Sequence, residues 1–151
     1  MNWYPHVTVA TTVERNGLFL MVEERKNGKL LLNQPAGHLE KNETLFEAAL
    51  RETREETQWQ VRLTGLLGNA LFTSPVNGVT YYRTSFVAEA LEQDLSQPLD
   101  SDIERAIWLS AEEIQHNKAR LRSPMIIHDI ARYQQKQIYP LELVSHPRAE
   151  A

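Results

Sequence analysis

The sequence has no cysteine, no long apolar run and no excess of basic residues, and each absence excludes a class of protein. Without cysteine, the 151-residue chain has no disulfide framework and no thiolate metal site. No stretch approaches the roughly 18 consecutive apolar residues of a membrane span. The N-terminal "MNWYPHVTVATTVERNG" lacks the pattern of a signal peptide. We therefore expect a cytoplasmic protein with no membrane partner.

Net charge and chain length indicate which partners and how many domains to expect. With Lys+Arg 16 and Asp+Glu 20, the formal net charge is -4, so no stable nucleic-acid partner is expected and any phosphate binding must be local. The length suits one domain, which we expect to span 1–144. The remainder, 145–151, has no apolar periodicity and is expected to fray. We expect a monomer or a small homo-oligomer.

The first third of the chain is predicted to be rich in β-strands. Strands are expected over 6–14, 18–25 and 30–35, where β-branched and other apolar residues dominate. The turn signals Asn16-Gly17 and Asn27-Gly28 separate these strands. This pattern predicts two consecutive hairpins.

A helix is predicted next, from about residue 44 to residue 57. Thr44 and Glu47 match a capping box, in which each side chain accepts a hydrogen bond from the backbone of the other residue. A second β-rich block and two short helices then complete the order. Its strands are expected over 61–73, 79–91 and 105–110, and its helices after Ser110 and after Ser123-Pro124.

Several glutamates gather on the side of the helix that should face the protein. One stripe at helical spacing is formed by Leu45, Ala48, Ala49, Glu52 and Glu56, with Glu55 beside it. Like charges four residues apart destabilise a helix by about 0.2–0.5 kcal/mol per pair, and burial adds to this cost. Arg51 can reach Glu47 or Glu55, but it is one charge against several. A divalent cation such as Mg²⁺ would offset the excess.

A solvated helix surface crossed by salt bridges is the simpler explanation of an isolated Arg-Glu-Glu cluster. The surrounding spacing argues against it here. Glycine, five residues, glutamate, seven residues, Arg-Glu, two residues and Glu-Glu form a highly specific pattern, which resembles the signature of the Nudix hydrolases. The matching residues are Gly37, Glu43, Arg51, Glu52, Glu55 and Glu56.

The sequence departs from the family signature at two positions. The family usually has an aliphatic residue where this chain has Thr53, and a glycine where it has Gln58. Threonine keeps the β-branched shape. If the helix ends at Gln58 in a left-handed conformation, a side chain costs roughly 1–2 kcal/mol relative to glycine. This departure puts the geometry of the exit loop in question, and not the metal ligands.

The resemblance implies an α/β fold, a Nudix-type α/β/α sandwich with a mixed β-sheet. It also implies that Glu52, Glu55 and Glu56 hold Mg²⁺ or Mn²⁺, with the backbone carbonyl of Gly37 as an additional ligand. Arg51 would orient the glutamates through ion pairs. Glu43 would support the junction between the loop and the helix.

The implied reaction is hydrolysis of a phosphoanhydride bond. A diphosphate repels a nucleophile, so metal ions are needed to neutralise its oxygens and to acidify the attacking water. Either Glu56 or Glu55 would accept the proton of that water. Arg83 and Arg122 are candidate phosphate contacts, because guanidinium groups fit phosphate oxygens, although an ordinary surface arginine is the more common case for each.

Glu104 resembles an acidic position that some family members bring to the metals. A charge at the end of a strand is the alternative for this residue. The stretches "NQPAGHLE", "LRSP" and "RYQQKQIYPLE" resemble a branch of phosphatases that act on nucleoside di- and triphosphates and on hydroxymethylpyrimidine diphosphate, a thiamine precursor. The expected partner is such a small molecule, with release of inorganic phosphate.

Two other functions are possible on the same fold. A binding module could sense a phosphorylated ligand without cleaving it, but it would have little reason to keep the repulsive glutamates. An isomerase would commonly use a cysteine, which this chain lacks.

The remaining histidines and aromatic residues give weaker signals. The five histidines show no pair at i, i+4 spacing, so a zinc site is not expected. Trp3, Phe72, Tyr81 and Tyr82 could stack on a base, although aromatic residues in strands more often pack in the core.

Overall fold

The computed structural model describes residues 2–149, so Met1 and the last two residues of the predicted tail, 150–151, lie outside the described residues. The chain forms a mixed seven-stranded sheet with the order β3-β2-β1-β6-β5, in which β4 pairs with β1 and β7 pairs with β2. β1 and β6 run parallel, and the other paired strands are antiparallel. The bounds are β1 His6–Arg15, β2 Leu18–Lys26, β3 Lys29–Asn33, β4 Ala36–His38, β5 Trp59–Thr73, β6 Thr80–Gln93 and β7 Ile103–Ser110.

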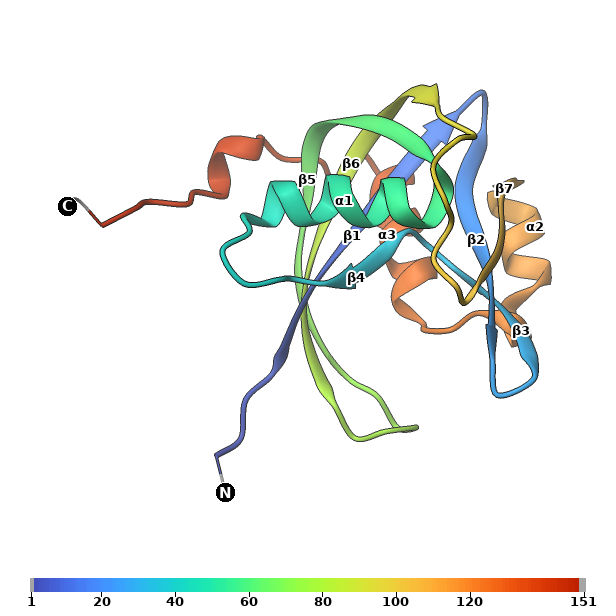
Figure 1. Ribbon diagram of the computed structural model, residues 1–151, viewed down its shortest axis with the longest axis horizontal. Coiled ribbons are helices and arrows are strands. Elements are labelled where there is room, and N and C mark those ends of the chain that lie inside the picture. The colour runs from blue at the N-terminus through green and yellow to red at the C-terminus, as the bar shows by residue number, and fades with distance from the viewer. Residues whose placement is uncertain (1, 150–151) are drawn as a thin grey trace.

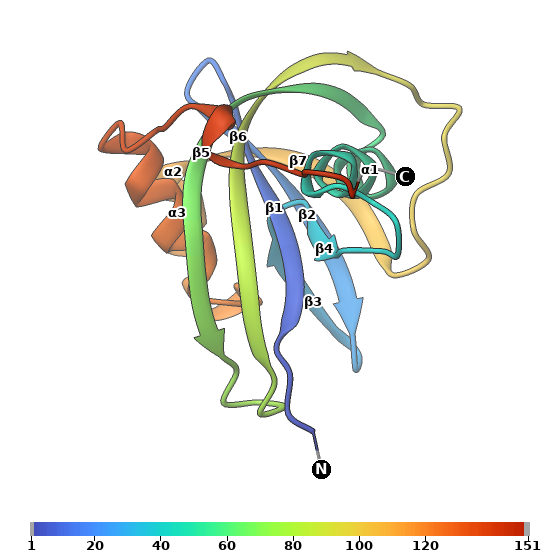
Figure 2. The ribbon, with the colours of Figure 1, turned by 90° about the vertical axis from the view of Figure 1, so that its left-hand side faces the viewer.

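Helices cover both faces of this sheet, as Figures 1 and 2 show. α1 lies on one face, and α2 and α3 lie on the other. Their bounds are α1 Leu45–Thr57, α2 Ala111–His116 and α3 Met125–Gln134, with short 3-10 turns at Lys118–Arg120 and Leu141–Leu143. The predicted α/β/α sandwich with a mixed sheet is therefore confirmed. In the described part of the chain, no helix is long and apolar enough to cross a membrane.

Each helical layer buries its own apolar cluster against the sheet. Ala48 and Ala49 of α1 pack on Val9, Leu66 and Phe86. On the opposite face, the cluster consists of Phe19, Met21, Ile114, Ile126 and Ile130. Burial of apolar area, at roughly 25 cal/mol per Å², holds α1 with its apolar stripe inward. The acidic end of the same stripe is thereby turned toward the sheet.

The local signals of the sequence are reproduced in the backbone. Both capping boxes form, at Thr44 with Glu47 and at Ser110 with Glu113. The Asn-Gly turns close the first two hairpins, with positive φ at Asn16 and Asn27. Ser123 accepts a hydrogen bond from the backbone of Met125, where α3 begins. The short strand β4 was not predicted.

The tail contains one ordered contact. His146 accepts a hydrogen bond from the backbone N–H of Leu45 at 3.1 Å, and its ring lies edge-on to Phe46, with 5.0 Å between the ring centroids. This contact ties the C-terminal segment to the start of α1. It lies inside the segment that was expected to fray.

Thr53, the first departure from the family signature, has a structural role inside α1. Its side chain is fully buried, and its hydroxyl donates to the carbonyl of Ala49 at 2.7 Å. The hydroxyl of Thr11 lies 2.9 Å from that of Thr53. Because the single proton of Thr53 goes to Ala49, Thr11 must donate to Thr53. The pair joins the helix to β1.

We predict that Thr53→Val lowers the free energy of unfolding by about 1–3 kcal/mol, because it leaves the buried hydroxyl of Thr11 without a partner. The double variant Thr11→Val with Thr53→Val replaces both polar groups by methyl groups, and we expect its stability to approach that of the wild type. Urea unfolding of the wild type, of the single variants Thr11→Val and Thr53→Val, and of the double variant measures these changes in the free energy of unfolding. Strictly additive losses in the double variant would contradict this assignment.

Candidate active site

The site begins where β4 passes the face of α1. β4 pairs with β1, which fixes Gly37 opposite Val9. A Cβ atom added to Gly37 would lie 2.2–2.4 Å from the carboxylate atoms of Glu52. Only glycine allows the strand to approach the carboxylate this closely. The glycine of the signature therefore makes room for the first glutamate.

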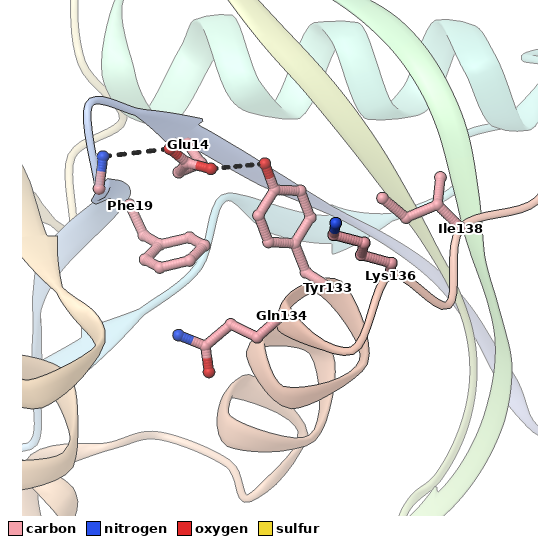
Figure 3. A pocket seen from close by; sticks show the side chains of 7 residues that line it. Glu14, Phe19, Tyr133, Gln134, Lys136 and Ile138 are labelled. Carbon is pink, nitrogen blue, oxygen red and sulfur yellow. Dashed lines mark hydrogen bonds between the residues drawn. The ribbon is translucent and has the colours of Figure 1, made fainter.

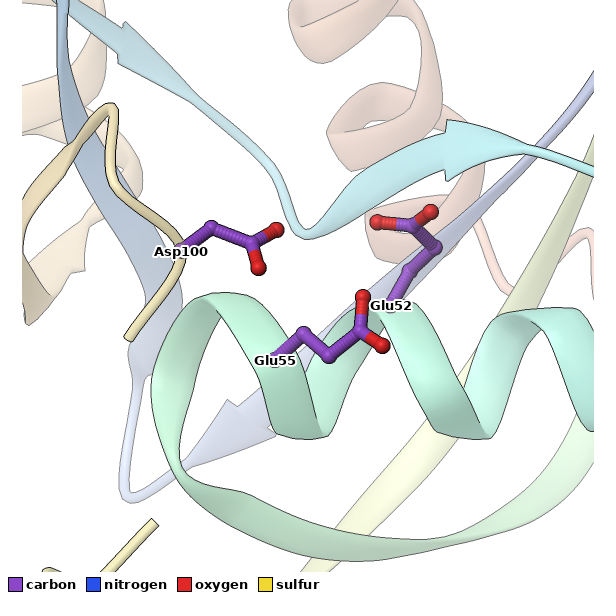
Figure 4. Close-up of side chains that lie close together, drawn as sticks. All are labelled: Glu52, Glu55 and Asp100. Atoms are coloured by element: carbon purple, nitrogen blue, oxygen red, sulfur yellow. The ribbon is translucent and has the colours of Figure 1, made fainter. Parts of the chain in front are cut away.

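Three carboxylates converge beside this strand. Glu52, Glu55 and Asp100 each offer an oxygen, and these oxygens all lie within 4.8 Å of one another. Figure 4 shows the two glutamates extending from consecutive turns of α1, with Asp100 facing them from the loop between β6 and β7. Carboxylate oxygens are the ligands preferred by Mg²⁺ and Mn²⁺. The donor set fits a hard divalent cation.

Glu56 lies next to this group and is more deeply buried. Its side chain lines a cleft beside these carboxylates, and the residue is only 7% exposed. One of its oxygens accepts a hydrogen bond from the backbone N–H of Ala36 at 2.8 Å. Burial raises the pKa of Glu56 well above its ordinary value, and the nearby carboxylate of Glu52 raises it further. Burial also raises the pKa of Glu52, although Arg51 opposes this effect.

Arg51 holds the acidic groups together. Its guanidinium donates to both oxygens of Glu43, at 2.6 and 3.0 Å. It also donates to Glu52 at 2.8 Å and to Glu55 at 3.2 Å, and to the backbone carbonyl of His38 at 3.0 Å. These hydrogen bonds raise the pKa of Arg51 and lower the pKa of Glu43. A single guanidinium thus orients three carboxylates and the end of β4.

A cleft of ≈ 700 Å³ opens beside the carboxylates. This volume is in the range of small-molecule sites. The lining of the cleft combines carboxylates, arginines and aromatic side chains. Its lining includes Gly37, Glu52, Glu56, Asp100, Arg83, Arg122, Phe72 and Tyr81. It therefore contains most of the residues that the sequence singled out.

The two arginines of the cleft are held by acidic partners. Arg83 is buried, and its guanidinium donates to Asp129 at 2.9 Å and to Ser85 at 3.2 Å. Arg122 donates to both carboxylate oxygens of Glu24 at 2.9 Å. These contacts fix the orientation of each guanidinium at the wall of the cleft. A phosphate contact at either residue remains a prediction.

Two acidic residues near β7 differ from the sequence-based expectation. Glu104 is half exposed, pairs with Arg25 at 2.6 Å and is not part of the cleft lining. Its contact with metals stays a prediction. Asp100, which no pattern in the sequence singles out, is the acidic residue that reaches Glu52 and Glu55. A loop has no periodicity that could have distinguished Asp100 from its acidic neighbours.

A second hollow of ≈ 730 Å³ lies away from the carboxylates, between the β1–β2 hairpin and α3 (Figure 3). Both oxygens of its Glu14 are engaged, one by the backbone N–H of Gly17 at 3.1 Å and one by the hydroxyl of Tyr133 at 2.6 Å. Burial and the bond to Glu14 raise the pKa of Tyr133 to about 12. Volume does not distinguish the two hollows, but the convergent carboxylates line only one of them.

Comparison with known proteins agrees with this geometry. The NUDIX domain family matches residues 4–130. Phosphatase NudJ of Escherichia coli strain K12 is 46% identical over 140 residues, which make up 93% of this chain and 90% of that protein.

Solved structures give the same result. A NUDIX hydrolase from Nitrosomonas europaea superimposes with a TM-score of 0.93 and 37% identity, covering 95% of this chain and 98% of that one. A bifunctional NMN adenylyltransferase/ADP ribose pyrophosphatase from Francisella tularensis, complexed with AMP and Mn ion, has a TM-score of 0.59 and 25% identity. That comparison covers 89% of this chain and 42% of that one.

We predict that Glu56→Gln stabilises the metal-free protein at neutral pH. Because burial raises the pKa of Glu56 in the folded state, the folded protein holds this proton more tightly than the unfolded chain does. The resulting stability is fully present below the pKa of the unfolded state and is lost as pH rises through the folded pKa. The amide keeps an oxygen for the N–H of Ala36 and carries no charge.

Thermal unfolding in a metal chelator, measured from pH 4 to pH 8, provides the test. The melting temperature of Glu56→Gln should exceed that of the wild type at high pH, and the difference should shrink as pH falls. Glu92→Gln is the control for net charge, since Glu92 is exposed. A gain of equal size in both variants, or a gain independent of pH, would contradict the burial of a charged Glu56.

Proposed function

The chain belongs to the Nudix family of hydrolases, and we propose on this premise that it hydrolyses nucleoside di- and triphosphates and related organic diphosphates with Mg²⁺ or Mn²⁺. The observation that carries the proposal is the convergence of Glu52, Glu55 and Asp100 within 4.8 Å. NudJ, at 46% identity, supports phosphatase chemistry. Hydroxymethylpyrimidine diphosphate is a proposed substrate within this class.

We propose that Glu52, Glu55 and Glu56 hold the metal, with the carbonyl of Gly37 and the carboxylate of Asp100 beside them. When bound, the divalent ion would neutralise phosphate oxygens and make the attacking water more acidic. The Francisella tularensis protein complexed with AMP and Mn ion supports Mn²⁺ as an alternative to Mg²⁺. Arg51 positions this group through its contacts with Glu52 and Glu55.

We assign the proton-accepting role to Glu56, with Glu55 as the alternative. Glu56 lies buried beside the acidic cluster, where a carboxylate within hydrogen-bond reach of the attacking water can accept its proton. The N–H of Ala36 holds one oxygen of Glu56 and leaves the other for the water. Arg83 and Arg122, which line the cleft, are proposed to bind phosphate oxygens.

The organic part of the substrate is proposed to lie toward Phe72 and Tyr81, which line the same cleft. The hydroxyl of Tyr81 accepts a hydrogen bond from Asn77 at 3.0 Å, which fixes the ring. Tyr82, the next residue of β6, points to the other face of the strand and is not part of the lining. Tyr81 can therefore be tested by substitution, with Tyr82 as its control.

The wider setting follows from the same properties. We propose that the protein acts in the cytoplasm, as a domain of residues 1–144, on small molecules and without a nucleic-acid or membrane partner. The net charge of -4 supports the absence of a nucleic-acid partner, because it offers no broad attraction for phosphates.

The assay uses purified protein, Mg²⁺, and a panel of nucleoside di- and triphosphates with hydroxymethylpyrimidine diphosphate, monitored for phosphate and pyrophosphate. We predict metal-dependent release of phosphate, and a decrease in turnover of about 10²–10⁴-fold when the general base is removed by Glu56→Gln or Glu55→Gln. Glu92→Gln serves as the control. Full turnover in both variants would contradict the assigned roles. Binding of the panel without any turnover would favour the binding module.

The tyrosine pair tests the position of the ring. Tyr81→Leu is expected to raise KM about tenfold for substrates with a base, since stacking of a base on an aromatic side chain is worth about 1–3 kcal/mol. Tyr82→Leu should leave KM unchanged. A diphosphate of an aliphatic alcohol, which has no ring, should not distinguish the variants. Equal effects of both substitutions, or an equal effect on the ring-free substrate, would place the ring elsewhere.

A further inference from the structure

The C-terminal end of α1 carries an unusual residue. Gln58 ends the helix in the left-handed conformation, with φ 65 and ψ 10, at the position where the family signature has glycine. A side chain is less favourable than glycine in this conformation. The backbone therefore does not explain the glutamine, and any compensating role falls to its side chain.

That side chain makes contacts that glycine cannot make. The amide Nε2 of Gln58 donates to the backbone carbonyl of Gln97 at 2.6 Å and lies 3.5 Å from the carbonyl of Leu95. The backbone carbonyl of Gln58 also accepts from the N–H of Asp94 at 2.8 Å. Gln58 is thus joined to the loop between β6 and β7 by both its side chain and its backbone. Figure 1 shows this loop passing the end of α1.

The same loop carries Asp100 to the acidic cluster. The backbone N–H of Asp100 donates to the carbonyl of Glu55 at 3.1 Å, which satisfies one of the free carbonyls at the helix end. The carboxylate of Asp100 then lies within 4.8 Å of those of Glu52 and Glu55. Three like charges so close together repel one another, so the loop must be held in place.

We propose that Gln58 is a positioning residue, whose side-chain amide anchors the β6–β7 loop against α1 and so keeps Asp100 at the acidic cluster. This inference rests on the proposed function, because the cluster is taken to be the metal site. In the sequence, Gln58 lies 37 positions from Leu95 and 39 positions from Gln97, so the anchor joins two distant segments. Its loss should release Asp100 while Glu52 and Glu55 stay on the helix.

Gln58→Gly separates the two properties of the residue, since it favours the left-handed backbone and removes the amide. Gln58→Asn also tolerates this backbone but is one methylene too short to keep the same contact. We expect both variants to fold. We also expect the thermal stability of Gln58→Gly to be at least that of the wild type. Gln60→Asn is the matched control, because Gln60 is exposed on β5.

The first readout is Mn²⁺ binding without substrate, measured by calorimetry. Changes in groups that orient metal ligands typically weaken affinity by 10–100-fold, and we expect about tenfold for Gln58→Gly and Gln58→Asn, with no change for Gln60→Asn. Asp100→Asn should weaken binding at least as much. Adding Gln58→Gly to Asp100→Asn should have no further effect, because Gln58 acts through Asp100.

The second readout is amide hydrogen exchange in the loop, which does not depend on metal or activity. Exchange at residues 94–100 should be faster in Gln58→Gly than in the wild type. Wild-type Mn²⁺ affinity in Gln58→Gly, or additive losses in the double variant, would overturn the inference and leave the proposed function intact. A wild-type protein that neither binds Mn²⁺ nor hydrolyses the panel would overturn the proposed function and, with it, this inference.

Discussion

The hydrogen bonds of Arg51 are the constraint on which the site depends. One guanidinium, with its side chain 14% exposed, contacts Glu43, Glu52 and Glu55 and the end of β4. It supplies one positive charge to a group that carries several negative ones. Because burial of a charge requires compensation, the remaining excess is best offset by a divalent cation. The apolar packing of α1 prevents the alternative, in which the helix would rotate its glutamates into solvent.

The carboxylates of the site also differ in whether they pair with Arg51 and in the direction of their pKa shifts. Glu43 accepts hydrogen bonds from Arg51 on both oxygens, which lowers its pKa. Glu56 makes no ion pair in the described residues, and burial raises its pKa. Neighbouring carboxylates with pKa values shifted in opposite directions are suited to different tasks. The sheet contributes by bringing β4 to the helix. Gly37 leaves room for the carboxylate of Glu52, and the backbone N–H of Ala36 donates to Glu56.

Most of the fold could be predicted, because its signals are local. The capping box at Thr44 and the Asn-Gly turns act within a few residues, and the structure confirms them. The strand β4 has only three residues, too few to show an alternating pattern. Asp100 and the side-chain contacts of Gln58 depend on a loop that is distant in the sequence, so no local pattern could have shown them. The sequence did identify Gln58 as a departure, and the helix does end there in a left-handed conformation.

The central claim is that the carboxylates of α1 form a divalent cation site. Anomalous diffraction from crystals grown with Mn²⁺ tests it most directly. We expect a manganese peak bonded to oxygens of Glu52, Glu55 and Glu56, with the carboxylate of Asp100 and the carbonyl of Gly37 beside it. Crystals in which these carboxylates point into solvent, with no manganese peak among them, would contradict the presence of a divalent cation site.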